Sequence, residues 1–211
     1  MRSPMLAKDF PGKRRAVVTY PVITGLTPVV LRRVRSVLDF KNIFDYSLKE
    51  YREDAWLSEF SYVVNYNNNY LLDITFSQSG SGAYPDDHTK HFLINLKDGS
   101  IVKPSHVFEA GKMNQIVARI DRELQQEIKR IASENKGSED GAATSEAYRQ
   151  LKFELKDLDD FSVGIKGITF HYDAGFPHVI KALEPEGRYF LTYSTLRSII
   201  KRDGLLGQFI D

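Results

Sequence analysis

The sequence contains no cysteine at all. This absence excludes disulfide bonds, zinc sites built on cysteine, and catalysis by a thiol. It does not decide the compartment, because a bacterial extracytoplasmic protein and a cytosolic protein can both lack cysteine. The missing cysteines therefore limit the chemistry of the chain but not its location.

Net charge and long apolar runs are also lacking. The 29 lysines and arginines nearly balance the 28 aspartates and glutamates, which leaves a net charge of +1. Such a chain has no electrostatic field to attract nucleic acid, so neither nucleic acid nor an anionic membrane is predicted as a partner. No apolar run is long enough to span a membrane, and the first ten residues lack the apolar core of a secretory signal peptide. The oligomeric state is left open.

Common catalytic motifs are missing as well. The stretch GSGAYP at residues 80–85 precedes a predicted strand and lacks the lysine–serine/threonine pair of a phosphate-binding loop. The sequence has neither a Gly-x-Ser-x-Gly nucleophile elbow nor a His-Glu-x-x-His zinc helix. The acidic runs SEDG and LKDLDDF are typical of solvated loops. We therefore predict no enzyme activity and no cofactor.

What is present is an ordinary globular composition with many aromatic residues. Among the 211 residues, 42% are hydrophobic, and there are 13 phenylalanines and 11 tyrosines. Large aromatic side chains bury much area each, so a sizeable core is expected. The length favours one domain or two closely packed subdomains. We expect a flexible leader at residues 1–13, an N-terminal α+β subdomain at residues 14–110, and a C-terminal α+β subdomain at residues 111–211 that packs intimately with the first.

The beginning of the N-terminal half predicts one strand and two helices. Residues 14–23 are rich in β-branched and aromatic side chains, which is typical of a strand. Thr27 and Pro28 then suit the N-cap and the first turn of an amphipathic helix. Residues 43–54 predict a second, shorter helix.

An antiparallel meander is predicted next. Three asparagines at residues 67–69 tolerate the left-handed backbone of a tight turn, and alternating strands flank them. The predicted meander covers residues 57–102, with strands at residues 57–66, 70–79 and 88–96 and a loop at residues 80–87.

The C-terminal half combines a long helix with short strands. Aliphatic residues recur at helical spacing in residues 113–135, whereas small and charged residues predict a solvated loop at residues 135–146. Strands are predicted on both sides of a turn near Lys166 and Gly167, and again at residues 188–194, before a terminal helix capped by Ser194 or Thr195. The predicted fold class is α+β, with mainly antiparallel sheets packed against a long amphipathic helix and with N- and C-terminal helices.

Histidines are the first candidates for chemistry, because they bind metals and transfer protons. His171 and Asp173 lie two residues apart and share a face if the strand continues, so with His178 they could form a two-histidine, one-carboxylate site. The alternative is that these groups end a strand and bond to backbone. His88 and His91 lie three residues apart in a predicted strand and face opposite sides of the sheet, so they are a poor chelating pair.

Tyrosines gather around the asparagine turn. Tyr62, Tyr66, Tyr70 and Tyr84 accompany the three asparagines, and this combination suits a binding surface. The alternative is that these rings simply pack on the sheet. An apolar connector at residues 173–187 should either cover a sheet edge or form part of a binding surface.

Several segments occur together in one order: FSYVVNYNNNYLLDITF, a Gly–Ala loop, NLKDGSIVKPSHVF, a long helix, GITFHYD and FLTYSTL. In this order the chain resembles the paired extracytoplasmic domains of unknown function in the lysozyme-responsive anti-sigma factor RsiV and the peptidoglycan deacetylase PdaC. The resemblance covers residues 14–202. It departs from the family at residues 80–85, where the family often has a histidine, and at residues 174–187. The anti-sigma segment and the deacetylase domain have no counterpart, so neither activity is implied.

The resemblance implies a non-catalytic binding or sensor module of the bacterial cell envelope, extracytoplasmic in location, whose partner is a lysozyme-like protein or a peptidoglycan fragment. Two alternatives stay open, namely a metal-dependent hydrolase that uses His171, Asp173 and His178, and a structural envelope domain without a small ligand. A cationic, lysozyme-like partner would favour acidic contacts. The candidate binding residues are Tyr84, Asp86, Asp87, His88, His171, Asp173 and His178.

Overall fold

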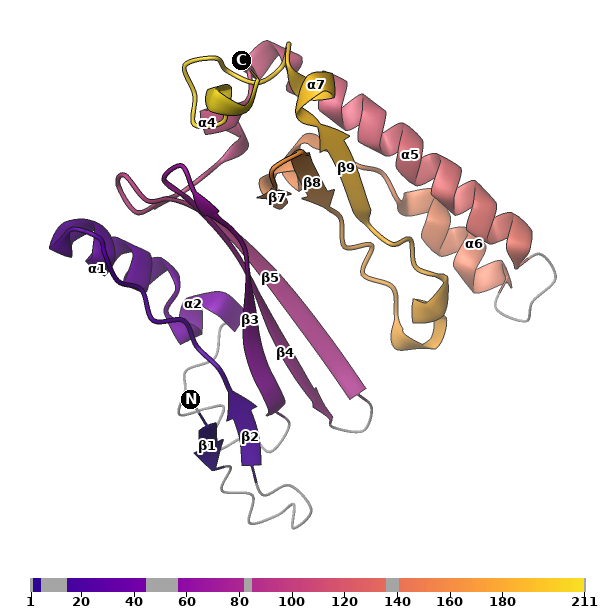
Figure 1. Ribbon diagram of the computed structural model, residues 1–211. Helices are drawn as coiled ribbons and strands as arrows, with labels where there is room; N and C mark the ends of the chain where they lie inside the picture. The colour runs from indigo at the N-terminus through magenta and orange to yellow at the C-terminus, as the bar shows by residue number, and fades with distance from the viewer. Residues whose placement is uncertain (1, 5–14, 45–56, 82–84, 136–140, 211) are drawn as a thin grey trace. The chain divides into compact units, whose positions relative to one another are not determined.

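The computed structural model describes residues 2–4, 15–44, 57–81, 85–135 and 141–210 (Figure 1). The chain divides into two compact units, Met1–Val102 and Lys103–Asp211, and each has a sheet and helices of its own. Most of the predicted leader at residues 1–13, most of the predicted helix at residues 43–54, and Tyr84 lie outside the described residues. Within the described part, no helix is both long and apolar enough to cross a membrane.

The first unit is built on a six-stranded sheet in the order β1-β2-β3-β4-β5-β6. The predicted meander is confirmed, because β3 to β6 pair antiparallel in sequence order. β2 instead pairs parallel with β3, so the sheet is mixed. The strands are β1 Arg2–Pro4, β2 Arg15–Val18, β3 Leu57–Asn68, β4 Leu71–Ser81, β5 Pro85–Asn95 and β6 Ser100–Ile101.

The predicted hairpin between β3 and β4 forms, but its turn lies at Asn69 and Tyr70, one residue later than residues 67–69, because Asn67 and Asn68 still belong to β3. Asn69 and Tyr70 both have positive φ, at 54° and 60°. Two successive residues of this kind define the hairpin turn that matches the twist of the flanking strands, and asparagine adopts this backbone more readily than most residues. The Asn68 side chain accepts a hydrogen bond from the Asn69 amide at 2.8 Å, which further stabilises the turn.

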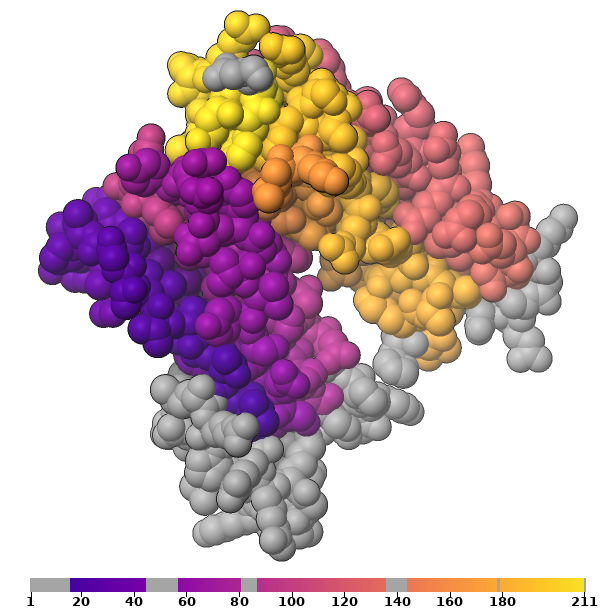
Figure 2. Space-filling view, viewed as in Figure 1, coloured from indigo at the N-terminus to yellow at the C-terminus, as the bar shows by residue number. Residues whose placement is uncertain are grey.

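One face of this sheet carries the core of the first unit. Helix α1, Pro28–Val37, lies along that face in Figure 1 and buries Val30 and Val34 against it. In the space-filling view, the atoms of α1 and of the neighbouring strands meet on the visible surface of the first unit (Figure 2). Pro28 occupies the first turn of α1 as predicted, but the Thr27 side chain makes no capping hydrogen bond. A short helix follows as α2, Phe40–Phe44. The sheet residues of this core are Ala16, Val18, Leu57, Phe60, Leu72, Ile74, Phe76, Phe92 and Ile94.

The second unit packs the long helix α5, Met113–Glu134, against a three-stranded antiparallel sheet in the order β7-β8-β9. The predicted apolar stripe is confirmed, since Ile116, Ile120, Leu124, Ile128 and Ile131 are the buried residues of α5. The predicted α+β fold class is therefore confirmed. The remaining elements are α4 Pro104–Val107, η1 Ala110–Lys112, α6 Gly141–Gln150, η2 Leu155–Asp159, β7 Phe161–Val163, β8 Gly167–His171, η3 His178–Leu183, β9 Arg188–Thr192, α7 Tyr193–Leu196 and η4 Gly207–Phe209.

The loop predicted at residues 135–146 is wrong in its second part, because α6 begins at Gly141. Thr144 and Tyr148 of this helix are buried. The Tyr148 ring lies 5.6 Å from the Phe176 ring, and its hydroxyl donates to the Leu183 carbonyl at 2.6 Å. The residues of α6 have little apolar character of their own, so these tertiary contacts stabilise the helix where local sequence does not.

The same contacts explain the apolar connector at residues 173–187. Its Phe176 is buried and packs against Tyr148, so part of the connector covers α6.

The predicted cap of the terminal helix is wrong. Thr192 caps α7 by accepting a hydrogen bond from the Thr195 amide at 3.2 Å, and the helix is only four residues long.

Candidate binding site: an apolar slot in the first unit

The three residues proposed for a metal site lie at the end of β8 and in the connector. Nε2 of His171 lies 3.0 Å from the Ser162 hydroxyl on the neighbouring strand. Asp173 accepts a hydrogen bond from the Gly175 amide at 2.9 Å and so stabilises a local turn. His178 begins η3, and its side chain lies outside the described residues. His171 and Asp173 therefore both make contacts that are typical of local structure.

The other predicted binding residues lie on β5. Asp87 and His88 are exposed, and they pair with Ser79 and Gln78 of β4. Adjacent residues of a strand point to opposite faces, so these two side chains do not converge. Tyr84 and the side chain of Asp86 lie outside the described part of the chain. His88 and His91 face opposite sides of the sheet, as predicted, because they are an odd number of residues apart in one continuous strand.

The tyrosines near the asparagine turn do not form one surface. Tyr62 packs on the core side, with its ring 6.2 Å from the Phe76 ring. Tyr66 accepts a hydrogen bond from the Asn69 side chain at 3.0 Å. Tyr70 is 64% exposed, and Nζ of Lys97 lies 5.2 Å from the centre of its ring. Tyr62 thus packs on the sheet, and the other two belong to the hairpin tip.

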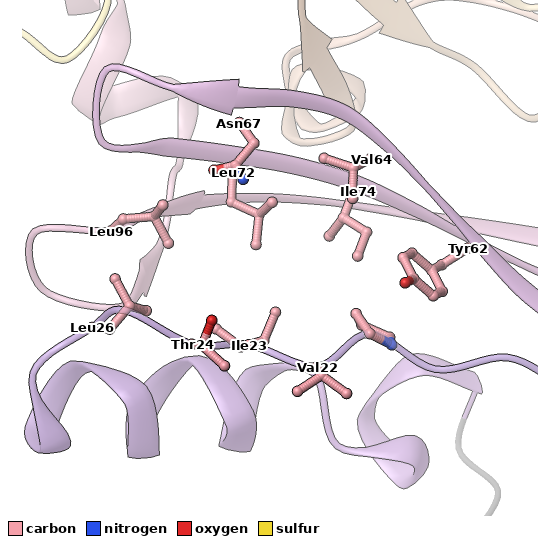
Figure 3. Close-up of a pocket in the computed structure, with 11 residues that line it drawn as sticks. Val22, Ile23, Thr24, Leu26, Tyr62, Val64, Asn67, Leu72, Ile74 and Leu96 are labelled. Carbon is pink, nitrogen blue, oxygen red and sulfur yellow. The ribbon is translucent and has the colours of Figure 1, made fainter. Parts of the chain in front are cut away.

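A cavity of about 210 Å³ opens in the first unit between the sheet and the segment of residues 21–26, and we call it the slot. Figure 3 shows Ile23 and Leu26 on one side of this space and Leu72 and Ile74 on the other, all pointing into it. The lining residues are Pro21, Val22, Ile23, Thr24, Leu26, Tyr62, Val64, Asn67, Leu72, Ile74 and Leu96.

The slot exists because the chain leaves the sheet after β2. Among the described residues, β2 pairs with β3 through Val17 and Val18, and the final hydrogen bond between these segments runs from the Thr19 amide to the Phe60 carbonyl at 2.7 Å. Pro21 follows shortly, and it has no amide hydrogen with which to extend the ladder. The segment then continues in an irregular conformation, and Gly25, with φ of +80°, turns it toward α1.

Tyr20 fixes the beginning of that segment. Its ring stacks on Phe40 with centroids 4.9 Å apart, and its hydroxyl donates to the Leu38 carbonyl at the end of α1. Burial, and then the Asp39 carboxylate, raise the pKa of Tyr20 above its usual value of 10.0. The hydroxyl therefore stays protonated at physiological pH and remains a hydrogen-bond donor. This anchor holds one wall of the slot in place.

The slot is apolar, uncharged and open on one side. Leu72 and Ile74 are buried at its floor, whereas Val22 is 83% exposed and Val64 is 44% exposed. None of the eleven lining residues is charged, and the polar groups among them are the hydroxyls of Thr24 and Tyr62 and the amide of Asn67. Ligand sites are commonly built in this way, from apolar walls with a few polar groups that set orientation. An apolar cavity of about 150 Å³ can hold benzene, so this slot suits one compact uncharged group.

Sequence reasoning missed the slot because it assigned residues 14–23 to a single strand. The available signal was Pro21, which cannot donate to a ladder and so marks the end of strand pairing. Among the predicted binding residues whose side chains the structure describes, namely Asp87, His88, His171 and Asp173, none lines the slot. Of the tyrosines weighed as a binding surface, Tyr62 does.

Comparison with known proteins finds similar folds among solved structures. No protein-family model matches the sequence, and no curated protein matches it. Among solved structures, the fold is similar to that of a DUF3298 family protein from Pseudomonas aeruginosa PAO1, with a TM-score of 0.58 and 15% sequence identity over 95% of this chain and 92% of that one.

A second similar structure is also a DUF3298 family member. It comes from Bacteroides fragilis NCTC 9343, with a TM-score of 0.46 and 12% identity over 72% of this chain and 56% of that one. The likeness to the Pseudomonas aeruginosa protein, at 15% identity, is one of fold.

Proposed function

We propose that this protein is a non-catalytic binding module of the bacterial cell envelope, and that it holds an uncharged apolar group of its partner in the slot. The observation that carries this proposal is that two exposed apolar residues, Val22 and Val64, line the slot, and we take them to mark its mouth. Exposed apolar side chains beside a preformed cavity are favourable for binding, because water leaves both surfaces when a ligand enters.

The envelope setting rests on likeness. The fold is similar to that of a DUF3298 family protein, and the sequence resembles extracytoplasmic domains of that general kind. A metal-dependent hydrolase has less support, because Asp173 stabilises a turn and His171 contacts Ser162.

The charge of the slot bears on the choice of partner. A strongly cationic, lysozyme-like protein would favour acidic contacts, and none of the described residues that line the slot is acidic. A peptidoglycan fragment can present uncharged apolar groups, and it is the partner that we favour. Exposed Asp87 lies on β5, outside the lining of the slot.

The test is calorimetry with soluble peptidoglycan fragments and, separately, with lysozyme. Val22→Glu places a charge at the mouth of the slot on a side chain that is already exposed, so the fold should tolerate it. Val179→Glu is the matched control, since Val179 is 82% exposed and belongs to the second unit. We expect binding of the fragments, at least a tenfold loss with Val22→Glu, and no change with Val179→Glu. Binding that both variants retain, or no binding of either partner, would contradict the proposal.

A further inference from the structure

The slot opens beside a strand edge that has lost its neighbour. Beyond the hydrogen bond from Thr19 to Phe60, no strand in the described part of the chain pairs with Tyr62 or Val64 on the side away from β4. β3 nevertheless continues to Asn68 and stays paired with β4 along that length. We call the backbone of Tyr62 and Val64 on this side the outer edge of β3.

The backbone groups of these two residues point toward that edge. The Phe60 carbonyl accepts from Thr19 and so faces β2. Amide and carbonyl groups of alternate residues in a strand point to the same side, so those of Tyr62 and Val64 face the same way. The irregularity in the β3–β4 register comes only between Val64 and Tyr66, so the alternation holds up to Val64.

The outer edge also lacks the usual protection against pairing with another chain. Proteins commonly place charged residues or proline on an exposed edge. From Ser61 to Leu72 the sequence is SYVVNYNNNYLL, with no charged residue and no proline. An extended peptide could therefore approach this edge without opposing charge and find hydrogen-bonding groups on it.

The side chains of Tyr62 and Val64 also line the slot, so the slot lies on the face of the sheet to which these residues point. Alternate side chains of any strand added beside β3 would point to that same face. One of them would lie at the mouth of the slot, beside Val22 and Val64. One bound segment would thus pair its backbone with β3 and also place an apolar side chain in the slot.

We propose that the outer edge of β3 binds an extended, uncharged peptide segment by strand addition, with one aliphatic side chain of that segment in the slot. This inference rests on the proposed function because it uses the same slot, and it names a peptide segment of the partner as the bound group. Main-chain hydrogen bonds supply affinity in such complexes, and the pocket for an alternate side chain supplies specificity.

The probes are acetylated and amidated pentapeptides of the form Thr-X-Thr-X-Thr, in which X is valine, leucine, isoleucine or serine, titrated into the full chain by calorimetry. We expect saturable binding of at least one aliphatic peptide at millimolar concentration and at least tenfold weaker binding of the serine peptide. Methylating the backbone nitrogens of alternate residues in the tightest peptide removes the donors of one edge. One of the two methylated registers should lose at least tenfold in affinity.

The matched protein variants are Val64→Pro and Val63→Ser. Val64→Pro removes an amide that faces outward, and proline is tolerated at such positions, so the ladder to β4 should persist while peptide affinity falls at least tenfold. Val63 is 61% exposed and points to the opposite face, so Val63→Ser should leave affinity unchanged. If Val64→Pro fails to fold, the methylated peptides carry the test alone.

The outcomes separate the two proposals. If peptidoglycan fragments bind in a Val22-dependent way but no peptide does, strand addition is overturned and the proposed function stands. Equal affinity for methylated and unmethylated peptides would also overturn strand addition, because the slot would then act without the edge. If neither fragments nor peptides bind, both proposals fail.

Discussion

At the scale of single residues, Gly187 shows how closely the backbone packs where the chain enters β9. Its φ is +67°, and a Cβ atom at this position would lie 2.0 Å from the Tyr172 carbonyl oxygen. The Tyr172 amide donates to the Gly187 carbonyl at 2.8 Å, which holds the two segments at this separation. Only glycine satisfies both the conformation and the space.

Gly187→Ala should therefore lower the free energy of unfolding by more than about 2 kcal/mol, because alanine adds left-handed strain and a backbone clash. Gly175→Ala is the matched control. Gly175 has φ of +65°, but a methyl group added there would have no other atom within 4 Å, so its cost should be about 1 kcal/mol, from conformation alone. Chemical denaturation measures both variants, and equal losses would show that the close approach to Tyr172 is unimportant.

Tyr189 is a second residue whose surroundings dictate its chemistry. Its hydroxyl donates to Glu127 of α5 at 3.2 Å, and the same carboxylate accepts from the Glu186 amide at 2.8 Å. Burial, and then the negative charge of Glu127, raise the pKa of Tyr189 far above its usual value of 10.0. The folded protein thus holds this proton more tightly than the unfolded chain does.

This pKa shift predicts a loss of stability in alkali. Above about pH 10 the unfolded chain releases the tyrosine proton while the folded protein keeps it, so the free energy of unfolding falls by up to about 1.4 kcal/mol per pH unit. Tyr189→Phe should lower stability near neutral pH, by about 1 kcal/mol for the lost hydrogen bond, yet make the alkaline decline shallower. Denaturation series at several pH values test this, and parallel declines for the two proteins would refute the assignment.

At the scale of secondary-structure elements, the transition from β9 to α7 depends on one hydroxyl. Oγ1 of Thr192 accepts from the Thr195 amide and also lies 2.8 Å from the Ser194 hydroxyl. Capping by a side-chain oxygen satisfies an amide that has no partner within the helix. The strand ends at Thr192 because the same residue begins the helix.

Thr192→Ala should cost about 1 kcal/mol of stability through the lost cap. Ser194→Ala should cost less, because Ser194 is exposed and does not cap the helix. The melting temperatures of the two variants give the comparison. A larger loss of stability with Ser194→Ala than with Thr192→Ala would instead support Ser194 as the cap, as predicted from the sequence.

The elements that sequence predicted well have strong periodic patterns of their own. The aliphatic stripe of α5 and the asparagine turn between β3 and β4 are both local signals. α6 was missed because its stability comes from Tyr148 packing on Phe176, a contact distant in sequence. The slot was missed for the same reason, since residues 21–26 meet Leu72, Ile74 and Leu96 only in the folded unit. Its residues are ordinary apolar types with no motif.

At the scale of the whole molecule, each unit has the means to fold by itself. In the part of the chain that the structure describes, the core of the first unit is built from residues between Ala16 and Leu96. The second unit buries its own stripe on α5 together with sheet residues such as Phe170 and Leu191. About 100 residues with one apolar core are enough for an independent domain.

Each unit, produced alone, should therefore unfold in one cooperative transition, and residues 1–102 alone should bind the ligand of the full chain with similar affinity. Circular dichroism during heating and calorimetry measure the two properties. If the second unit alone melts cooperatively and the first unit alone does not, the first unit requires the rest of the chain to fold. Ligand binding by residues 103–211 alone would contradict the assignment of the binding site to the first unit.

The most direct test of the central claim is methyl NMR of the full chain titrated with soluble peptidoglycan fragments. We predict that the methyl signals of Val22, Ile23, Leu26, Val64, Leu72 and Ile74 shift together and saturate with one dissociation constant. The α5 methyls of Ile116, Ile120 and Leu124 should remain unchanged. Saturable shifts confined to the second unit, or no shifts at any fragment concentration, would contradict the claim that the slot is the binding site.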